Sequence, residues 1–286
     1  MQETTIETLA IASSAGGFKG VFAHGVLSAF EAAGIRAGAY AATSSTVFPA
    51  ISAAIGQANE IALKYWRVAL KTLGEPGKGM SESVLETIAA SGHILRHQPF
   101  RSGMPRIVLA TSAVITAEGA QATQGDGARR LGRRLLLQAA RGDRSWAEQH
   151  LQAYLFDTAA DDEQYRLTSA NIDEVIYAST RMLHAWNIPA WVAGRPYIDG
   201  YYTCACPAIE MAQRGYREII AIANEPGVLY RDIFQSEHIP DDWQGIPIHI
   251  IRPEIDPATL GAGFIDVTDE GLVAGYQHGL EIGQKF

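Results

Sequence analysis

The chain has 286 residues, of which 47% are hydrophobic and 19% are charged. This composition excludes a disordered tail, a coiled coil and a disulfide-stabilised miniprotein. A chain of this size buries roughly 73% of its unfolded surface on folding, which suffices for a core without metal or disulfides. The 23 basic and 31 acidic residues give a net charge of −8, which argues against a nucleic-acid partner, because binding phosphates needs surplus Lys and Arg.

Three sequence features bear on the compartment. The amino end, Met1 to Glu7, carries acids where a secretory signal needs basic residues, so export is not indicated. The most apolar stretch, Val47 to Ile55, is interrupted by Pro49 and is shorter than the roughly 20 residues that a membrane span needs. Only Cys204 and Cys206 occur, one residue apart, a poor frame for a structural disulfide. We therefore expect a cytoplasmic protein with reduced thiols.

The first part of the chain alternates strand and helix patterns. An apolar strand over Ile6–Ala12 is followed by a loop of small residues and by a helix that reaches about Ala33. A second strand over Ala37–Thr43 leads to a second helix over Ser45–Ile55. This alternation predicts an α/β fold with a mainly parallel sheet covered by helices.

The remaining elements follow from apolar spacing. We expect helices at 59–73, 81–95, 128–140, 145–155, 172–180, 207–214 and 271–286. We expect strands at 106–116, at the residues that end with Asp199, at 218–223 and at 246–251. No internal repeat or Pro-rich linker occurs, so we predict one domain over 1–286 with a variable helical insertion around 58–171.

The first candidate site element is the loop Gly16-Gly17-Phe18-Lys19-Gly20 between a strand and a helix. Backbone N–H groups at such a position can converge on a negative oxygen, with the helix N-terminus behind them. The spacing differs from the P-loop and from the dinucleotide-binding fingerprint. The pattern alone fits either an anion-binding loop or a tight turn.

The second element is Ala42-Thr43-Ser44-Ser45-Thr46, where the second strand meets its helix. This is the place of a nucleophile elbow, which exposes a serine hydroxyl above a sheet and needs small neighbours. Pro49 lacks an N–H and indicates that the following helix begins late or bends. Ser44 is the candidate nucleophile, with Ser45 as its rival.

The third element is Asp199-Gly200, at the end of a predicted strand. Asp-Gly is usually a turn. An aspartate at the end of a strand can also accept the proton of a serine on a neighbouring strand and so activate the nucleophile. The three elements together favour a catalytic arrangement over three unrelated turns.

With these motifs in this order, the sequence resembles the patatin-like phospholipase family. The matching pieces are Ser14–Gly20 with His24–Leu27, Gly34-Ile35, Ala42–Thr46, Ala178–Thr180, Asp199-Gly200 and Gly215 with Glu218–Ile222. The resemblance covers about residues 6–57 and 172–224.

The resemblance implies a three-layer α/β/α fold with a serine–aspartate dyad and neither cofactor nor metal. It assigns Ser44 as nucleophile and Asp199 as base, and the amides of Gly16, Gly17 and Phe18 as the oxyanion hole. It gives Lys19 and Gly200 supporting places and implies hydrolysis of an acyl ester or lipid through an acyl-Ser44 intermediate. The sequence departs from the family pattern at four residues that stand in glycine positions: Ala15, Ala42, Thr46 and Tyr201.

Other functions remain open at this stage. Arg129, Arg130, Arg133 and Arg134 crowd one predicted helix and could face an acidic carrier protein or an anionic membrane surface, as well as plain solvent. An acyltransferase or thioesterase acting on a carrier-bound acyl group is therefore an alternative. A non-catalytic relative that binds an acyl chain is another, because the elbow departs from its usual glycines.

Several further residues have both a chemical and a structural interpretation. A histidine triad could use His238, His249 or His278, which follow Asp199 in hydrolase order. His93 and His97 have the spacing of a zinc pair but no third ligand nearby in the sequence. Trp186–Trp191 fits a pocket wall or an interfacial surface, with core packing as the default.

Overall fold

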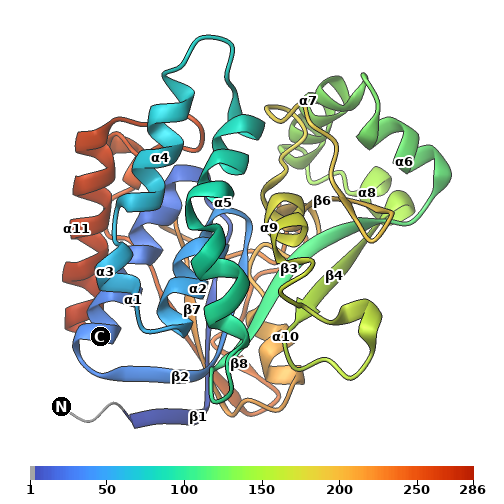
Figure 1. The fold of residues 1–286 in the computed structure, drawn as a ribbon. Helices are drawn as coiled ribbons and strands as arrows, with labels where there is room; N and C mark the ends of the chain where they lie inside the picture. The colour runs from blue at the N-terminus through green and yellow to red at the C-terminus, as the bar shows by residue number, and fades with distance from the viewer. Residues whose placement is uncertain (1–3) are drawn as a thin grey trace.

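A computed structural model describes residues 4–286 (Figure 1). Residues 1–3, part of the amino end from which we expect no export signal, lie outside the described residues. The structure is α/β, with one nine-stranded sheet in the order β5-β6-β3-β2-β1-β7-β9-β8 and with β4 paired to β3 off this path. The strands are β1 Thr4–Ser13, β2 Ile35–Thr43, β3 Arg106–Val114, β4 Leu151–Asp157, β5 Trp191–Val192, β6 Arg195–Asp199, β7 Glu218–Ile222, β8 Asp242–Trp243 and β9 Ile246–Ile251.

The sheet is mixed but mostly parallel, as the alternation of elements predicted. Strands β1, β2, β3, β7 and β9 run parallel to their partners among themselves, while β4 and β6 run antiparallel to β3. The helices are α1 Val21–Ala32, α2 Val47–Ala54, α3 Ala58–Ile61, α4 Lys64–Leu73, α5 Met80–His97, α6 Ala117–Gln124, α7 Ala128–Ala139, α8 Ser145–His150, α9 Ile172–Thr180, α10 Ala208–Gln213 and α11 Asp269–Lys285.

Side-chain alternation along the strands builds the layers. In β1, Leu9 and Ile11 join the core cluster that holds α1, α2, α5 and α9, whereas Ala10 and Ala12 join the cluster that holds α10. Since successive side chains of a strand point to opposite faces, the sheet is covered on both sides. These contacts agree with a three-layer α/β/α arrangement. The second face is lined mainly by alanines, which let α10 and its loops approach the strands closely.

One predicted helix is wrong. The expected helix over 145–155 ends at His150, and β4 begins at Leu151. Strand β4 pairs antiparallel with the edge of β3 along residues 108–114. Its Tyr154, Leu155 and Phe156 suit a strand, and pairing with β3 overrides a spacing that fits a helix equally well.

The expected helix over 59–73 is broken into α3 and α4 near Ala62, whose φ is +38°. Within 58–171, β3 and β4 belong to the sheet, and helices account for most of the rest. In Figure 1, α6, α7 and α8 gather on the upper right, apart from α4, α5 and α11 on the left. Across residues 4–286, no helix has both the length and the apolar character needed to cross a membrane.

Candidate active site

Ser44 occupies a tight turn between β2 and α2. Strand β2 ends at Thr43, residues 44–46 form a single 3-10 turn, and α2 begins at Val47, so the helix starts late, as Pro49 indicated. Ser44 has a φ of +62°, a conformation that costs a non-glycine residue about 1 kcal/mol or more and that occurs most often at functional sites. This turn places Ser44 directly after the carboxyl end of strand β2.

The Ser44 hydroxyl donates a hydrogen bond to Asp199. The distance from Ser44 Oγ to Asp199 Oδ2 is 2.7 Å, and the Tyr201 amide donates to the other carboxylate oxygen, Oδ1, at 2.8 Å. Each oxygen of the Asp199 carboxylate therefore accepts a hydrogen bond, and the two bonds fix the orientation of the group. The structure brings together the two residues that the sequence proposed as nucleophile and base.

Burial changes the protonation of this aspartate. Asp199 is fully buried, and desolvation raises its pKa to about 7, against the opposing effect of the hydrogen bonds from Tyr201 and Ser44. Among residues 4–286, no Lys, Arg or His forms an ion pair with it. A carboxylate with a pKa near neutrality is a much stronger base than one with an ordinary pKa.

Strand register explains why these two residues meet. Strand β4 occupies one edge of β3, so β2 and β6 share the other edge and meet end to end. Thr43 of β2 lies opposite Ala110, and Asp199 of β6 lies opposite the next residue, Thr111. Because β2 runs parallel and β6 antiparallel to β3, the final residue of each strand faces the final residue of the other.

The close meeting of β2 and β6 requires a glycine at 200. A β-carbon on Gly200 would lie 2.6 Å from the Ala110 carbonyl oxygen and 2.7 Å from Thr43 Cγ2. Both distances are shorter than real contacts, so a larger residue would push the strand ends apart. Gly200 supports the dyad by allowing this approach.

Two serines that were not predicted as site residues, Ser179 and Ser112, form hydrogen bonds to the backbone of Ser44 and Asp199. Ser179 Oγ accepts from the Ser44 amide at 2.9 Å and donates to the Ala110 carbonyl at 2.7 Å. Ser112 Oγ donates to the Asp199 carbonyl at 2.7 Å. The only sequence signal for Ser179 was its place in the family resemblance, and Ser112 had none.

The Gly-rich loop offers two free amides beside Ser44. Within residues 4–286, no group accepts a hydrogen bond from the Gly16 or Gly17 amide. The Phe18 amide, in contrast, donates to the Phe264 carbonyl at 3.2 Å. Gly17 has a φ of +57°, and a β-carbon on it would lie 2.1 Å from that same carbonyl oxygen. Of the three amides expected in an oxyanion hole, those of Gly16 and Gly17 are therefore free in this conformation, whereas the Phe18 amide anchors the loop.

Lys19 anchors the loop through two ion pairs and, among the described residues, bonds to neither Ser44 nor Asp199. Its ammonium lies 2.7 Å from Glu225 and 3.2 Å from Asp256. Burial disfavours the charged form of Lys19, but these two ion pairs outweigh that effect and raise its pKa. The side chain supports the shape of the loop.

Thr46, at one of the altered elbow positions, and its neighbour Ser45 both form side-chain hydrogen bonds near Ser44. Thr46 is fully buried, and its hydroxyl lies 2.8 Å from the Thr43 carbonyl and 3.1 Å from the Ser14 carbonyl. The Ser45 hydroxyl donates to the Gly17 carbonyl at 2.6 Å, so Ser45, the rival nucleophile, is engaged with the oxyanion loop and not with Asp199. Both side chains tie the elbow to that loop.

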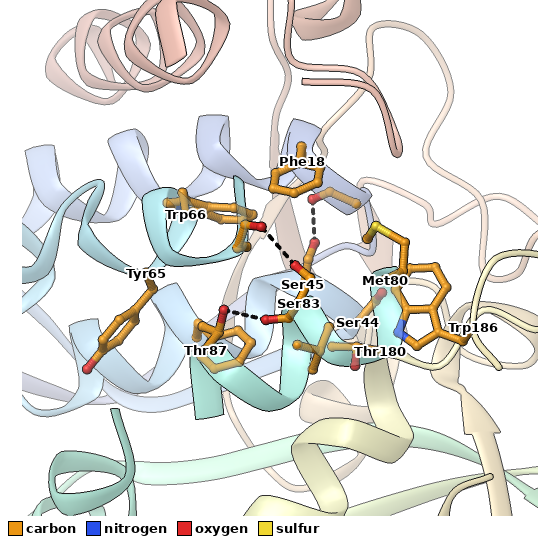
Figure 2. A pocket seen from close by; sticks show the side chains of 14 residues that line it. Phe18, Ser44, Ser45, Tyr65, Trp66, Met80, Ser83, Thr87, Thr180 and Trp186 are labelled. Atoms are coloured by element: carbon orange, nitrogen blue, oxygen red, sulfur yellow. Dashed lines mark hydrogen bonds between the residues drawn. The ribbon is translucent and has the colours of Figure 1, made fainter. Parts of the chain in front are cut away.

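An apolar cavity of about 50 Å³ opens beside Ser44 (Figure 2). The hydroxyls of Ser83 and Thr87 in its wall are bound to backbone carbonyls, at 3.2 and 2.8 Å, so they add little polarity. Trp186 belongs to the wall, whereas Trp191 is 46% exposed. The lining residues are Gly17, Phe18, Ser44, Ser45, Phe48, Tyr65, Trp66, Ala69, Met80, Ser83, Val84, Thr87, Thr180 and Trp186.

The histidines proposed for a triad do not reach the dyad. His249 lies 3.5 Å from Glu218, and His278 accepts the Glu254 amide hydrogen at 3.1 Å. No hydrogen bond or ion pair in the described chain links His238, His249 or His278 to Asp199. The site therefore contains a dyad without histidine.

The other candidate ligands also lie apart from Ser44. The rings of His93 and His97 meet edge to face with their centroids 5.2 Å apart, and the described residues contain no group of three or more His, Cys, Asp or Glu that could hold a metal. Cys204 and Cys206 are buried free thiols that do not line the apolar cavity beside Ser44, and the Cys204 carbonyl accepts the Thr43 hydroxyl hydrogen at 2.9 Å.

Helix α7 presents four arginines to solvent. Arg129, Arg130, Arg133 and Arg134 are all exposed, while Leu131 and Leu135 face inward. Over residues 4–286 these arginines form no ion pair, although Arg129 and Arg133 lie close enough to His184 to help burial lower its pKa. The basic face is therefore available to a negatively charged partner.

Comparison with models of known protein families gives no match, and comparison with curated proteins gives none either. The likeness to patatin-like phospholipases thus rests on the sequence motifs alone.

Proposed function

We propose that the protein is a serine-dependent acyl hydrolase that uses Ser44 as nucleophile and Asp199 as base, as patatin-like enzymes do. The observation that carries the proposal is the 2.7 Å hydrogen bond between Ser44 Oγ and the buried Asp199 carboxylate. Its setting supports the same conclusion, since Ser44 lies in a strained turn at the wall of an apolar cavity. The substrate is an acyl ester or a lipid, with the acyl chain in that cavity.

In the first half of the reaction, Asp199 takes the Ser44 proton as Oγ attacks the ester carbonyl carbon. The carbonyl oxygen becomes an oxyanion, which the Gly16 and Gly17 amides stabilise; one such donor typically contributes about 3 to 4 kcal/mol. The tetrahedral intermediate then expels the alcohol, to which Asp199 returns the proton. The product is an ester between the acyl group and Ser44.

In the second half, Asp199 takes a proton from water as the water oxygen attacks the acyl-enzyme. Collapse of this intermediate releases the carboxylic acid and restores the Ser44 hydroxyl with the proton from Asp199. A pKa of about 7 for Asp199 suits both steps, because the same group must accept and donate a proton near neutral pH.

The cavity favours a short acyl chain. A water molecule needs roughly 10–15 Å³ of cavity measured in the same way, so about 50 Å³ accommodates a chain of only a few carbons. We expect a p-nitrophenyl butyrate to be hydrolysed faster than a p-nitrophenyl laurate.

Substitution of the dyad tests the proposal. We expect Ser44→Ala to abolish turnover of p-nitrophenyl butyrate and labelling by a fluorophosphonate, and Asp199→Asn to reduce kcat by roughly 10² to 10⁴. Ser45→Ala is the comparison variant: it removes a neighbouring hydroxyl and its bond to the Gly17 carbonyl, so turnover should fall, but it leaves Ser44 and Asp199 in place, so labelling should persist. Undiminished turnover by folded Ser44→Ala would exclude the proposed nucleophile.

A second candidate is a thioesterase or acyltransferase that acts on a carrier-bound acyl group. The supporting observation is the exposed, unpaired face of Arg129, Arg130, Arg133 and Arg134, which suits an acidic carrier or an anionic membrane surface. Reversal of three of these charges should then slow turnover of the carrier-bound substrate but not of p-nitrophenyl butyrate. We place the protein in the cytoplasm, a proposal that the free thiols of Cys204 and Cys206 support.

A further inference from the structure

The apolar cavity beside Ser44 has two distinct ends. Figure 2 shows Ser44 and Trp186 at one end of the lining and Tyr65 at the other, with Trp66 between them. An acyl group bonded to Ser44 Oγ and placed in this cavity therefore extends toward Tyr65. The residue that closes that end decides how long an acyl chain fits.

Tyr65 reaches the cavity because the chain breaks between α3 and α4. Ala62, with its positive φ, follows the end of α3, and α4 begins anew at Lys64. Tyr65 and Trp66 then face inward in the first turn of α4, and Ala69 lies one turn further along on the same face. The small side chain of Ala69 leaves open space beside two large rings.

The Tyr65 ring has buried protein behind it. Its centroid lies 6.0 Å from that of Phe48, and only 8% of the residue is exposed. Burial raises the pKa of the Tyr65 hydroxyl, and the Ser91 hydroxyl beside it opposes that effect. Ser91 is itself 1% exposed and donates to the Thr87 carbonyl within α5. Tyr65 therefore has no free space into which it could turn to admit a longer chain.

Trp66 closes the side of the cavity and is also held in place. Its Nε1 donates to His24 Nδ1 at 3.0 Å, and His24 Nε2 lies 3.1 Å from the Ala58 carbonyl oxygen. Burial lowers the pKa of His24 to about 4, so Nδ1 remains an acceptor at neutral pH. The indole also lies against the ring of Phe18, with centroids 6.1 Å apart. An acyl chain therefore has no way out past Trp66 and ends at Tyr65.

We propose that Tyr65 sets the acyl-chain length by closing the cavity at the end remote from Ser44. The inference rests on the proposed hydrolase function and adds the residue that selects short-chain acyl esters among its substrates. A chain of a few carbons fills the volume of about 50 Å³, and a longer chain meets the Tyr65 ring. Among the described residues Tyr65 forms no hydrogen bond with Ser44 or Asp199, so its role is in specificity.

Tyr65→Ala and Tyr65→Phe are the matched variants, because the first removes the ring and the second removes only the hydroxyl. Tyr65→Ala opens room for roughly four methylene groups, and each methylene that moves from water into an apolar site favours binding about fourfold. Part of this gain is realised in a site that relaxes. We expect kcat/KM for p-nitrophenyl octanoate, relative to p-nitrophenyl butyrate, to rise at least about tenfold in Tyr65→Ala. Tyr65→Phe should keep the parent's order of preference.

Phe30→Ala controls for a general loosening of the core. Phe30 is 2% exposed, packs against Phe286 and does not line the apolar cavity, so its loss should lower stability without lengthening the cavity. Urea unfolding shows whether each variant is folded under the assay conditions. Tyr65→Leu, which keeps a smaller apolar side chain, takes the place of Tyr65→Ala if that variant does not fold, and the octanoate-to-butyrate ratio should then rise about threefold.

Binding of esters to Ser44→Ala protein tests the same wall without turnover. The probes are methyl butyrate and methyl octanoate, and calorimetry measures the Kd of each. In Ser44→Ala alone, methyl octanoate should bind no more tightly than methyl butyrate. With Tyr65→Ala added, methyl octanoate should bind at least about tenfold more tightly than methyl butyrate.

Three results would overturn the proposal. They are an unchanged octanoate-to-butyrate ratio in a folded protein without the Tyr65 ring, an equal rise of that ratio in Tyr65→Phe, and an equal rise in Phe30→Ala. Absence of ester turnover in every form, with the shift in methyl ester binding still present, would refute the hydrolase function and leave the role of Tyr65 in selecting chain length intact.

Discussion

Replacing Asp199 by asparagine should stabilise the protein at alkaline pH while it impairs the proposed catalysis. Burial raises the pKa of Asp199 from 3.8 to about 7, so the folded state holds its proton more tightly than the unfolded state does. At 1.36 kcal/mol per pKa unit, keeping this group ionised above pH 7 costs the folded protein about 4 kcal/mol. Asparagine carries no charge, accepts the Tyr201 hydrogen bond through Oδ1 and can donate to Ser44.

The sign of the pH dependence follows from proton binding. Between pH 4 and 7 the folded protein binds more protons at this site than the unfolded protein, so the stability contributed by Asp199 falls as pH rises through that window. The advantage of Asp199→Asn over the parent protein should therefore grow from about 2 kcal/mol at pH 5 to about 4 kcal/mol at pH 8.

Urea unfolding of both proteins at the two pH values measures this difference. Asp157→Asn is the control with the opposite sign. Asp157 is also buried, and although desolvation opposes its charge, Arg106 at 2.6 Å and Arg214 at 3.2 Å lower its pKa overall. Its substitution should reduce stability at pH 8, and the loss should shrink as pH falls. Two results would refute the argument that burial raises the pKa of Asp199. One is an Asp199→Asn protein that is no more stable than the parent at pH 8, and the other is a difference in unfolding free energy that is the same at both pH values.

Three further outcomes follow from the same geometry. The kcat/KM for p-nitrophenyl butyrate should fall about tenfold per pH unit below an apparent pKa of about 7; a flat profile between pH 5 and 8 would rule out Asp199 as the base. Gly200→Ala should destabilise the protein by about 2 kcal/mol and slow turnover, because its β-carbon would lie 2.6 Å from the Ala110 oxygen. Gly127→Ala, with open space and a φ of −78°, should be neutral in the same unfolding assay. Thr46→Val keeps the shape of the side chain but loses the bond to the Thr43 carbonyl, so a loss of about 1–2 kcal/mol is expected by calorimetry; an unchanged unfolding temperature would mean that the hydroxyl contributes nothing.

The first half of the site could be predicted from local patterns alone. Strand β1, the Gly-rich loop, α1, β2 and the elbow at Ser44 follow one another within short distances, and each has its own signal in apolar spacing or small residues. The alternation of Leu9 and Ile11 with Ala10 and Ala12 also encodes the two faces of the sheet. Local sequence is sufficient there because neighbouring elements pack on one another.

The meeting of Ser44 with Asp199 could not be derived from local patterns. It depends on β6 pairing antiparallel with the same edge of β3 that β2 uses, and on β4 filling the other edge. The segment of β4 has helical spacing, so the sequence predicted a helix over 145–155 and left that edge open. Before the structure, only the order of the three motifs and the family resemblance linked Ser44 with Asp199, and neither gave the pairing of their strands.

Contacts made by the last part of the chain could not be predicted from the sequence either. The Phe264 carbonyl accepts a hydrogen bond from the Phe18 amide, and the Asn224 side chain donates one to the Ser14 carbonyl. Neither residue lies in a motif, and the contacts of both depend on the folded path of the chain. This is why Phe18 was expected in the oxyanion hole but instead anchors the loop.

The altered glycine positions have a physical explanation that the sequence did not reveal. Glycine in an elbow serves to avoid crowding, but here the β-branched Thr46 is accommodated and its hydroxyl lies within hydrogen-bonding distance of the carbonyls of Thr43 and Ser14. Ser45 adds a bond to the Gly17 carbonyl. The strained Ser44 and the two free amides are thus held by one set of side-chain bonds. Strain at a single residue persists when its surroundings fix it, so Thr46 replaces the freedom of a glycine with specific bonds and is compatible with a nucleophile at Ser44.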